Sequence, residues 1–149
     1  MENNDSKDML KVARIENGVV IDHIATGKGM EIYRLLGLDS FETPVIILKN
    51  VDSKTYGKKD IIKVDGNINV DYDILGFVDP KATVSIIKDG EVVEKKTLKL
   101  PDKLSNVIKC KNPRCITTTE TDMKHLFNLT DANLGVYRCT YCQHPYFAV

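Results

Sequence analysis

The stretch CKNPRC at residues 110–115 decides the fold of the C-terminal part of this chain, because it places two cysteines either side of four residues. A second pair, CTYC at residues 139–142, follows after residues 116–138, and the chain has 4 cysteines in total. Two short turns that each supply a pair of thiolates are typical of tetrahedral zinc sites, in which the sulfurs lie about 2.3 Å from the metal. We therefore predict one structural Zn²⁺ per chain, held by Cys110, Cys115, Cys139 and Cys142.

Four thiolates fill the coordination shell of zinc, so the predicted metal has no open position for a reacting water. The alternatives are a pair of disulfides, a set of unrelated buried thiols and a redox-active CxxC motif. The N-terminus lacks the apolar segment of a signal peptide, which predicts a cytoplasmic protein, and metal binding is the more usual role of cysteines in that reducing compartment. His125 or His144 could replace a cysteine ligand, but four cysteines already suffice.

Composition excludes several broad classes of protein. The chain has 149 residues, of which 42% are hydrophobic and 28% are charged, as in globular proteins. With 21 basic and 21 acidic residues, it has no net charge that would attract nucleic acid or an anionic membrane surface. The apolar run VIIL at residues 45–48 is far too short to cross a membrane. We expect no nucleic acid and no membrane among its partners.

The clearest domain boundary lies near Pro101, where a strand-like pattern stops before the cysteine-containing segment begins. We predict a disordered tail at residues 1–9, one domain at residues 10–101 and a zinc-binding domain at residues 102–149. The second domain is too short for an independent hydrophobic core. Metal binding, worth about 10–16 kcal/mol in structural zinc peptides, would then supply most of its folding free energy.

Upstream of the boundary, the sequence predicts strands interrupted by two helices. The strands are expected at residues 10–15 and 18–24, with a turn at Asn17-Gly18, and at residues 43–50, 58–66 and 81–100, the last as a hairpin around Asp89-Gly90. The helices are expected at residues 26–38, with Thr26 as N-cap and Gly37 as the stop, and at residues 70–78. The order βαββαβ predicts a ferredoxin-like sheet with both helices on one face. The chain is thus predicted to be α+β, with a ferredoxin-like domain followed by a small all-β zinc ribbon of rubredoxin-like type.

Lysines gather in the predicted strand GKKDIIKV and in a later strand. Lys59 and Lys63 are four residues apart, so both are expected on one face of the sheet, about 13 Å from each other. Their flexible stems could converge on a triphosphate, and Lys95 and Lys96 add further charge; the alternative is a solvated lysine face. The chain has no Gly-rich phosphate loop. In the segment VIDHI, alternation places Asp22 and His23 on opposite faces, and no catalytic constellation is evident.

The order of these motifs resembles one known family. The segments GVVIDHI (18–24), KDIIK (59–63), P-x-A-T-V (80–84) and EVVEK (91–95), followed by C-x4-C and C-x2-C, are similar to the regulatory chain of aspartate carbamoyltransferase. The match runs from about residue 10 to the C-terminus. The resemblance implies a non-catalytic chain that binds CTP and ATP competitively, with UTP acting alongside CTP in some members.

The resemblance also implies partners and site residues. Two regulatory chains would pair through their N-terminal domains, and three such dimers would tie two catalytic trimers together through the zinc domains. Asp22 and His23 would contact ribose and phosphate. The other implied effector-binding residues are Lys59, Lys63 and Lys95 for phosphate, ribose and the base side, Val20 beside the base, and the backbone of Val12, Ala13, Arg14 and Ile15 at the base edge.

The chain departs from the family pattern at a few positions. At Ala13 and Arg14 the family has an acidic and then a small residue, and Gly90 stands where an aromatic residue can line the pocket. Asn112, Arg114, Glu120 and Gln143 fall in the region that faces a catalytic chain in the family. The competing interpretation is a zinc-ribbon module that binds nucleic acid or another protein, joined to a separate small-ligand sensor domain.

Overall fold

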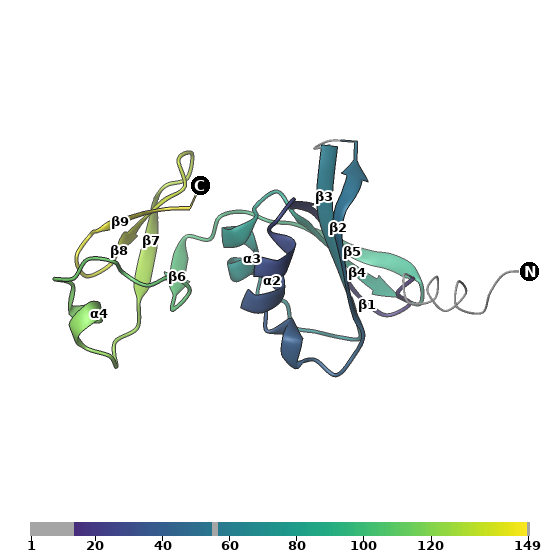
Figure 1. Cartoon of the computed structure of the whole chain (residues 1–149), viewed down its shortest axis with the longest axis horizontal. Helices are drawn as coiled ribbons and strands as arrows, with labels where there is room; N and C mark the ends of the chain where they lie inside the picture. Colours follow the sequence, from purple (N-terminus) through teal and green to yellow (C-terminus); the bar gives the residue numbers. More distant parts are fainter. Residues whose placement is uncertain (1–13, 55–56, 149) are drawn as a thin grey trace, which may run out of the picture. The chain divides into compact units, whose positions relative to one another are not determined.

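The computed structural model describes residues 14–54 and 57–148, which form two compact units divided between Leu98 and Lys99. Each unit is built on one antiparallel sheet, of five strands in the first and four in the second (Figure 1). The predicted fold class, a ferredoxin-like domain followed in sequence by a small zinc-type domain, is confirmed. In the described part of the chain, no helix is long and apolar enough to cross a membrane.

The N-terminal unit follows the βαββαβ order and adds one strand. Its elements are β1 (Gly18–Ala25), α2 (Gly29–Leu35), a 3₁₀ turn η1 (Leu38–Ser40), β2 (Val45–Ser53), β3 (Gly57–Asp65), α3 (Tyr72–Val78), β4 (Thr83–Lys88) and β5 (Glu91–Thr97). The strand order is β2-β3-β1-β4-β5, and every pair of neighbours is antiparallel. Strand β5 is the returning half of the hairpin predicted around Asp89-Gly90.

The core of this unit lies between the sheet and the two helices, which cover the same face (Figure 1). Alternate residues of the central strands point into it: Val19 and Ile21 of β1, and Ile62 and Val64 of β3, are 4% exposed or less. Ile32 of α2 and Leu75 of α3 pack into the same cluster. The strands therefore present one apolar face to the helices, and the side chains between these positions belong to the opposite face.

The N-cap of helix α2 is Lys28, two residues after Thr26, so the predicted N-cap is wrong. Lys28 occupies the cap position and makes no side-chain capping bond. The buried carboxylate of Asp60 on β3 replaces it: one oxygen accepts from the amides of Gly27 and Gly29, both at 3.1 Å, and the other from Asn50 at 3.1 Å. Helix ends need acceptors for their first amides, and here a neighbouring strand provides one. Gly37 adopts φ 66° and stops the helix as predicted.

The predicted strand at residues 10–15 lies mostly outside the described residues. Arg14 and Ile15, which are described, are not in a strand. The residues that follow bond to two neighbouring turns: the amide of Gly90 donates to the carbonyl of Glu16 at 2.9 Å, and that of Gly66 donates to Asn17 at 2.8 Å. These carbonyls are therefore used by loops and do not continue a hairpin ladder.

The C-terminal unit contains β6 (Lys103–Ser105), α4 (Ile116–Thr119), β7 (Leu126–Asp131), β8 (Val136–Cys139) and β9 (Pro145–Phe147), with strand order β6-β7-β8-β9. It is not entirely β, because the four-residue helix α4 follows Cys115. Its core is small: Leu104, Phe127 and Tyr137 are 2% exposed or less. The Tyr137 hydroxyl donates to the carbonyl of Pro101 at 2.6 Å. A core this small is consistent with a unit whose folding requires a bound metal ion.

We predict that Asp60→Ala lowers the free energy of unfolding of the N-terminal unit by about 3 kcal/mol, because the amides of Gly27, Gly29 and Asn50 lose the charged acceptor that they share. Amide hydrogen exchange at Ile62 and Val64 measures this change within the unit. Asp52→Ala is the matched control, since the Asp52 side chain is 91% exposed. Unchanged protection in Asp60→Ala would mean that water satisfies these amides equally well.

Candidate functional site

The four cysteines meet in the C-terminal unit at the geometry that zinc requires. Their sulfur atoms all lie within 4.8 Å of one another. The Sγ atoms of Cys110 and Cys142 are 3.5 Å apart, and those of Cys115 and Cys139 are 3.7 Å apart. A tetrahedron of sulfurs about 2.3 Å from a central ion has edges of about 3.8 Å. The donor set and its spacing therefore fit one structural zinc ion.

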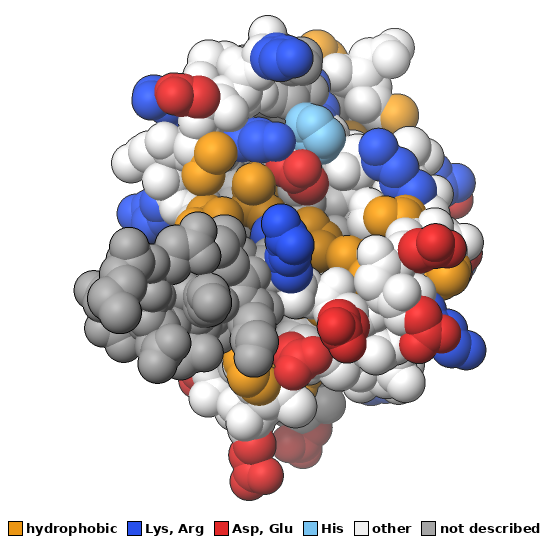
Figure 2. Space-filling model, turned by 90° about the vertical axis from the view of Figure 1, so that its right-hand side faces the viewer, with side chains coloured by type: hydrophobic (Ala, Val, Ile, Leu, Met, Phe, Trp, Pro, Cys, Tyr) orange, Lys and Arg blue, Asp and Glu red, His pale blue; other side chains and the backbone are white. Residues whose placement is uncertain are grey.

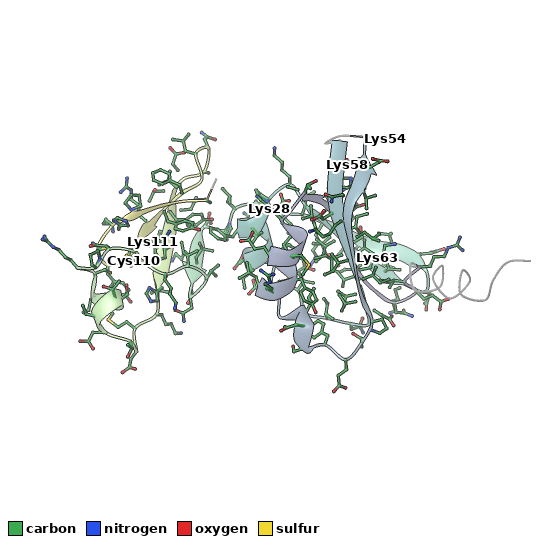
Figure 3. All side chains as sticks on the ribbon, viewed as in Figure 1. Lys28, Lys54, Lys58, Lys63, Cys110 and Lys111 are labelled. Carbon is green, nitrogen blue, oxygen red and sulfur yellow. The ribbon has the colours of Figure 1, made fainter. Side chains whose placement is uncertain are left out.

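Local backbone turns hold three of these ligands in place. The Cys115 amide donates to the carbonyl of Asn112 at 3.0 Å, while the Cys139 amide donates to His144 at 3.1 Å. In the turn around Cys142, the amide of Gln143 donates to the carbonyl of Cys139 at 2.9 Å, and Gln143 has φ 66°. These bonds orient the sulfurs towards one another. Figure 3 marks Cys110, with Lys111 beside it, in this unit.

The thiols differ in their surroundings. Burial raises the pKa of the Cys110 thiol to about 12 and also raises that of Cys139. The Thr117 hydroxyl lies 3.1 Å from the Cys115 sulfur and lowers the pKa of that thiol to about 7. Metal binding must displace the protons that burial retains, so a divalent cation supplies the charge that makes four neighbouring thiolates stable. Sequence reasoning missed Thr117, although its place two residues after a ligand is a usable signal.

The helix-free face of the five-stranded sheet carries several of the predicted effector residues. We call it the outer face and define it by Val20, Asp22, Lys59, Lys63, Ser85 and Lys95. Register places Lys63, Val20, Ser85 and Lys95 opposite one another in one row across β3, β1, β4 and β5. Figure 2 views the molecule from this side and shows basic, acidic, histidine and hydrophobic side chains gathered together.

Neighbouring lysines on β5 point to opposite faces. Lys95 is opposite Ser85 in the outer-face row, whereas Lys96 is opposite the fully buried Val84. The ammonium of Lys96 lies 4.4 Å from the ring centre of Tyr72 on α3 and 3.6 Å from Glu94. Lys96 therefore belongs to the helix side of the sheet. Of this predicted pair of charges, Lys95 alone joins the outer face.

His23 does not alternate with Asp22 as the sequence predicted. The register of β1 shifts between Ile21 and Ile24, both of which are fully buried, and His23 has φ 59°. This bulge leaves Asp22 and His23 side by side between two core-facing residues. The His23 ring nitrogen Nδ1 lies 3.1 Å from the Thr83 hydroxyl, on the strand position paired with Asp22. Both residues thus reach the outer face, and Thr83 joins them.

An ion pair links two of the predicted residues. The Lys59 ammonium lies 3.0 Å from a carboxylate oxygen of Asp22, and the two side chains are 17% and 28% exposed. Partial burial raises the pKa of Asp22, but the hydrogen bonds from Lys59 and from the His23 amide outweigh it, so the pKa is lowered. Asp22 is therefore charged at neutral pH, with oxygens able to accept hydroxyl donors.

The remaining predicted residues are less well defined. Val12 and Ala13 lie outside the described residues, Arg14 is exposed and Ile15 is half-buried. Their assignment to an effector site stays a prediction. In Figure 3, Lys58 lies near the hairpin end of β3 and Lys63 farther along that strand. Lys58 pairs with exposed Asp52 at 2.6 Å, away from the row that contains Lys63.

Comparison with known proteins assigns both units. Residues 10–99 match the family model of the aspartate carbamoyltransferase regulatory chain, allosteric domain, and residues 102–147 match that of its metal binding domain. The chain belongs to this family of regulatory chains. Curated relatives carry the name of the regulatory chain. The protein of Clostridium botulinum is 46% identical over 93% of this chain and 94% of the relative, and that of Bifidobacterium longum is 42% identical over 89% and 96%.

The two family models place the outer face and the cysteine cluster in different domains. The outer face belongs to the allosteric domain, and the four-cysteine cluster belongs to the metal binding domain. Because the thiolates close the coordination shell, the zinc has a structural role. The predicted family and the predicted zinc are both confirmed.

We predict that Cys139→Ser abolishes stoichiometric zinc binding and unfolds the metal binding domain, because zinc contributes about 10–16 kcal/mol to such sites. Zinc content by atomic absorption and NMR peak dispersion measure the two effects. Thr140→Ser in the same turn is the matched control and should keep one zinc per chain. A folded domain in zinc-free Cys139→Ser would contradict the structural role of the metal.

We predict that Lys59→Met raises the pKa of Asp22, because the ammonium that favours the carboxylate is removed. In the unaltered chain, the lowered pKa means that the ion pair stabilises the fold above the ordinary pKa of Asp. This contribution disappears as the pH falls through the lowered value. Carboxyl carbon shifts in an NMR titration report the change. Lys58→Met should leave the Asp22 titration as it was, and an unaltered curve in Lys59→Met would rule out the coupling.

Proposed function

We propose that this chain is the non-catalytic regulatory subunit of aspartate carbamoyltransferase in de novo pyrimidine biosynthesis, acting in the cytoplasm. Its allosteric domain binds CTP and ATP at one site, and UTP where that nucleotide acts alongside CTP. Its metal binding domain contacts the catalytic chain. The observation that carries the effector assignment is the gathering of three lysines, an aspartate and a histidine on the outer face of one sheet.

The chemistry of the outer face suits a nucleoside triphosphate. Lys63 and Lys95 stand three strand spacings apart, about 14 Å between their backbones. Their long side chains can converge from both ends on a chain of phosphates, while Lys59 lies on the same face beside Asp22. Ammonium groups give charge-assisted hydrogen bonds to phosphate oxygens. A face that combines such donors with an ionised carboxylate and apolar side chains complements all three parts of a nucleotide.

Each residue then has a role. Lys95 binds phosphates, and Lys59 and Lys63 bind ribose, base-side or phosphate groups. Asp22 accepts hydrogen bonds from the ribose hydroxyls, while His23 donates a hydrogen bond to ribose or phosphate. Val20 packs beside the base, whose edge is read by the backbone of residues 12–15, since amides and carbonyls discriminate amino from keto groups.

Effector action requires two arrangements of the assembled enzyme. CTP and ATP compete for one site but favour different arrangements, and each shifts the equilibrium by its differential affinity, typically about 1–3 kcal/mol. In this proposal residues 10–101 sense the nucleotide, and residues 102–149 convey the bias to the catalytic chain. Regulatory chains pair through their allosteric domains, and three pairs hold two catalytic trimers together.

The contact with the catalytic chain is assigned to residues close in sequence to the zinc ligands. The residues concerned are Asn112, Arg114, Glu120 and Gln143, all within three residues of a cysteine ligand or of helix α4. Arg114, Glu120 and Gln143 are exposed. Zinc fixes the loops that present these side chains, so loss of metal removes the contact surface together with the fold.

The nucleotide assignment is tested by calorimetric titration of the full chain with CTP and with ATP. Lys95→Ala, Lys59→Ala and Lys63→Ala should each weaken binding about tenfold or more, because each removes a charge-assisted hydrogen bond. Lys96→Ala is a close control, since the neighbouring lysine points to the helix side. Equal affinity of the Lys95→Ala and Lys96→Ala chains would contradict an effector site on the outer face.

The assembly assignment is tested separately by mixing the chain with the catalytic trimer of the same organism and measuring mass in solution. A large complex is expected with zinc loaded, and none after thiol-reactive metal removal. Absence of a complex in the zinc-loaded sample would refute the role of the metal binding domain. Salt-dependent RNA binding by that sample would instead favour the nucleic-acid module considered from the sequence.

A further inference from the structure

The side chain of His125 accepts a hydrogen bond from the backbone of a zinc ligand. His125 lies just before β7, half-buried, and its ring nitrogen Nδ1 is 3.2 Å from the backbone amide of Cys110. The amide is the donor, so Nδ1 is the acceptor. In a neutral imidazole, the proton is then carried by Nε2. The bond links the residue just before β7 to the first ligand of the first cysteine pair.

Two hydrogen bonds to Asn106 fix the position of the His125 backbone, from which the imidazole extends. The His125 amide donates to the Asn106 side chain at 2.8 Å, and the Asn106 amide donates to the His125 carbonyl at 2.8 Å. This reciprocal pair extends the β6–β7 ladder by one step beyond Ser105 and Leu126. Asn106 has φ 56°, a left-handed conformation that asparagine tolerates well. The chain therefore leaves β6 sharply and returns to Cys110 past the imidazole.

Cys110 differs in this respect from the ligands held by local turns. The amides of Cys115 and Cys139 donate to backbone carbonyls three and five residues away in the chain, at Asn112 and His144. The amide of Cys110 donates to a side chain 15 residues away. Because the acceptor is a side chain, the hydrogen bond from the Cys110 amide can be removed by mutating His125 without changing the backbone.

We propose that His125 is a positioning residue of the zinc site: it holds the backbone of Cys110 so that its sulfur faces that of Cys142, and it does not bind the metal. The four-thiol group contains no histidine nitrogen, and Nδ1 is already occupied by the Cys110 amide. Residues that orient metal ligands through hydrogen bonds typically contribute 10–100-fold to metal affinity. His125 therefore does not substitute for a cysteine ligand.

The test compares substitutions that differ in where they place an acceptor. The side-chain oxygen of Asn lies near the position of Nδ1, whereas that of Gln lies one bond farther out. In zinc-loaded full-length chain at pH 8, release of zinc to a colorimetric chelator should be about 10–100-fold faster in His125→Ala and His125→Gln. His125→Asn should stay close to the unaltered chain. His144→Ala is the control, because the exposed His144 uses its carbonyl and not its ring.

Two spectroscopic readouts separate positioning from a general loss of stability. Nitrogen-15 shifts of the imidazole should identify the tautomer with its proton on Nε2, and the Cys110 amide proton should move upfield in His125→Ala. Cadmium-113 substituted for zinc should keep a four-sulfur chemical shift in His125→Asn. Equal zinc release from the Asn and Gln variants would overturn the proposal, even if the Ala variant fails to fold. A cadmium shift characteristic of three sulfurs and one nitrogen in the unaltered chain would also overturn it, in favour of direct ligation.

Discussion

The alternation of side chains along strand β1 is the constraint on which the N-terminal domain depends. The strand lies between β3 and β4, so one of its faces must fill the core while the other remains available to a ligand. Strict alternation would send one of two adjacent polar residues into the core. The bulge between Ile21 and Ile24 adds one residue to the strand, and this keeps both isoleucines buried while Asp22 and His23 stay together. Local backbone strain at His23 is thus the cost of a two-residue polar site in a central strand.

The metal binding domain depends on its metal because its hydrophobic core is small. Its sheet is built from short strands and buries few large side chains, so apolar burial alone is a weak source of stability. Four sulfurs brought within 4.8 Å of one another are unfavourable as thiolates and unreactive as buried thiols, but they become a strong cross-link once a divalent ion is present. Folding of this domain is consequently coupled to zinc binding. The contact surfaces that the domain presents therefore also require zinc.

Much of this could be predicted from sequence because the signals were local. The cysteine spacing gave the metal site, and the strand and helix order gave the ferredoxin-like sheet. Lys59 and Lys63 lie on one face because the strand between them is regular. The errors arose where tertiary contacts override local pattern. Thr26 looked like a helix cap, but Asp60 reaches the same amides from another strand. The ring contacts of His23 and His125 are with partners 60 and 15 residues away in the chain, which a local pattern does not reveal.

The hydrogen bond from the Tyr137 hydroxyl to the carbonyl of Pro101 has a consequence for where the zinc domain can be cut. Tyr137 is fully buried in the middle of that domain's sheet, and the carbonyl of Asp102 also accepts from the Leu129 amide at 2.8 Å. An excised domain that began at residue 102 would lose the first of these acceptors and place a new charged amino terminus beside the second. The self-contained folding unit therefore starts no later than Pro101, inside the segment that sequence alone assigns to the N-terminal domain.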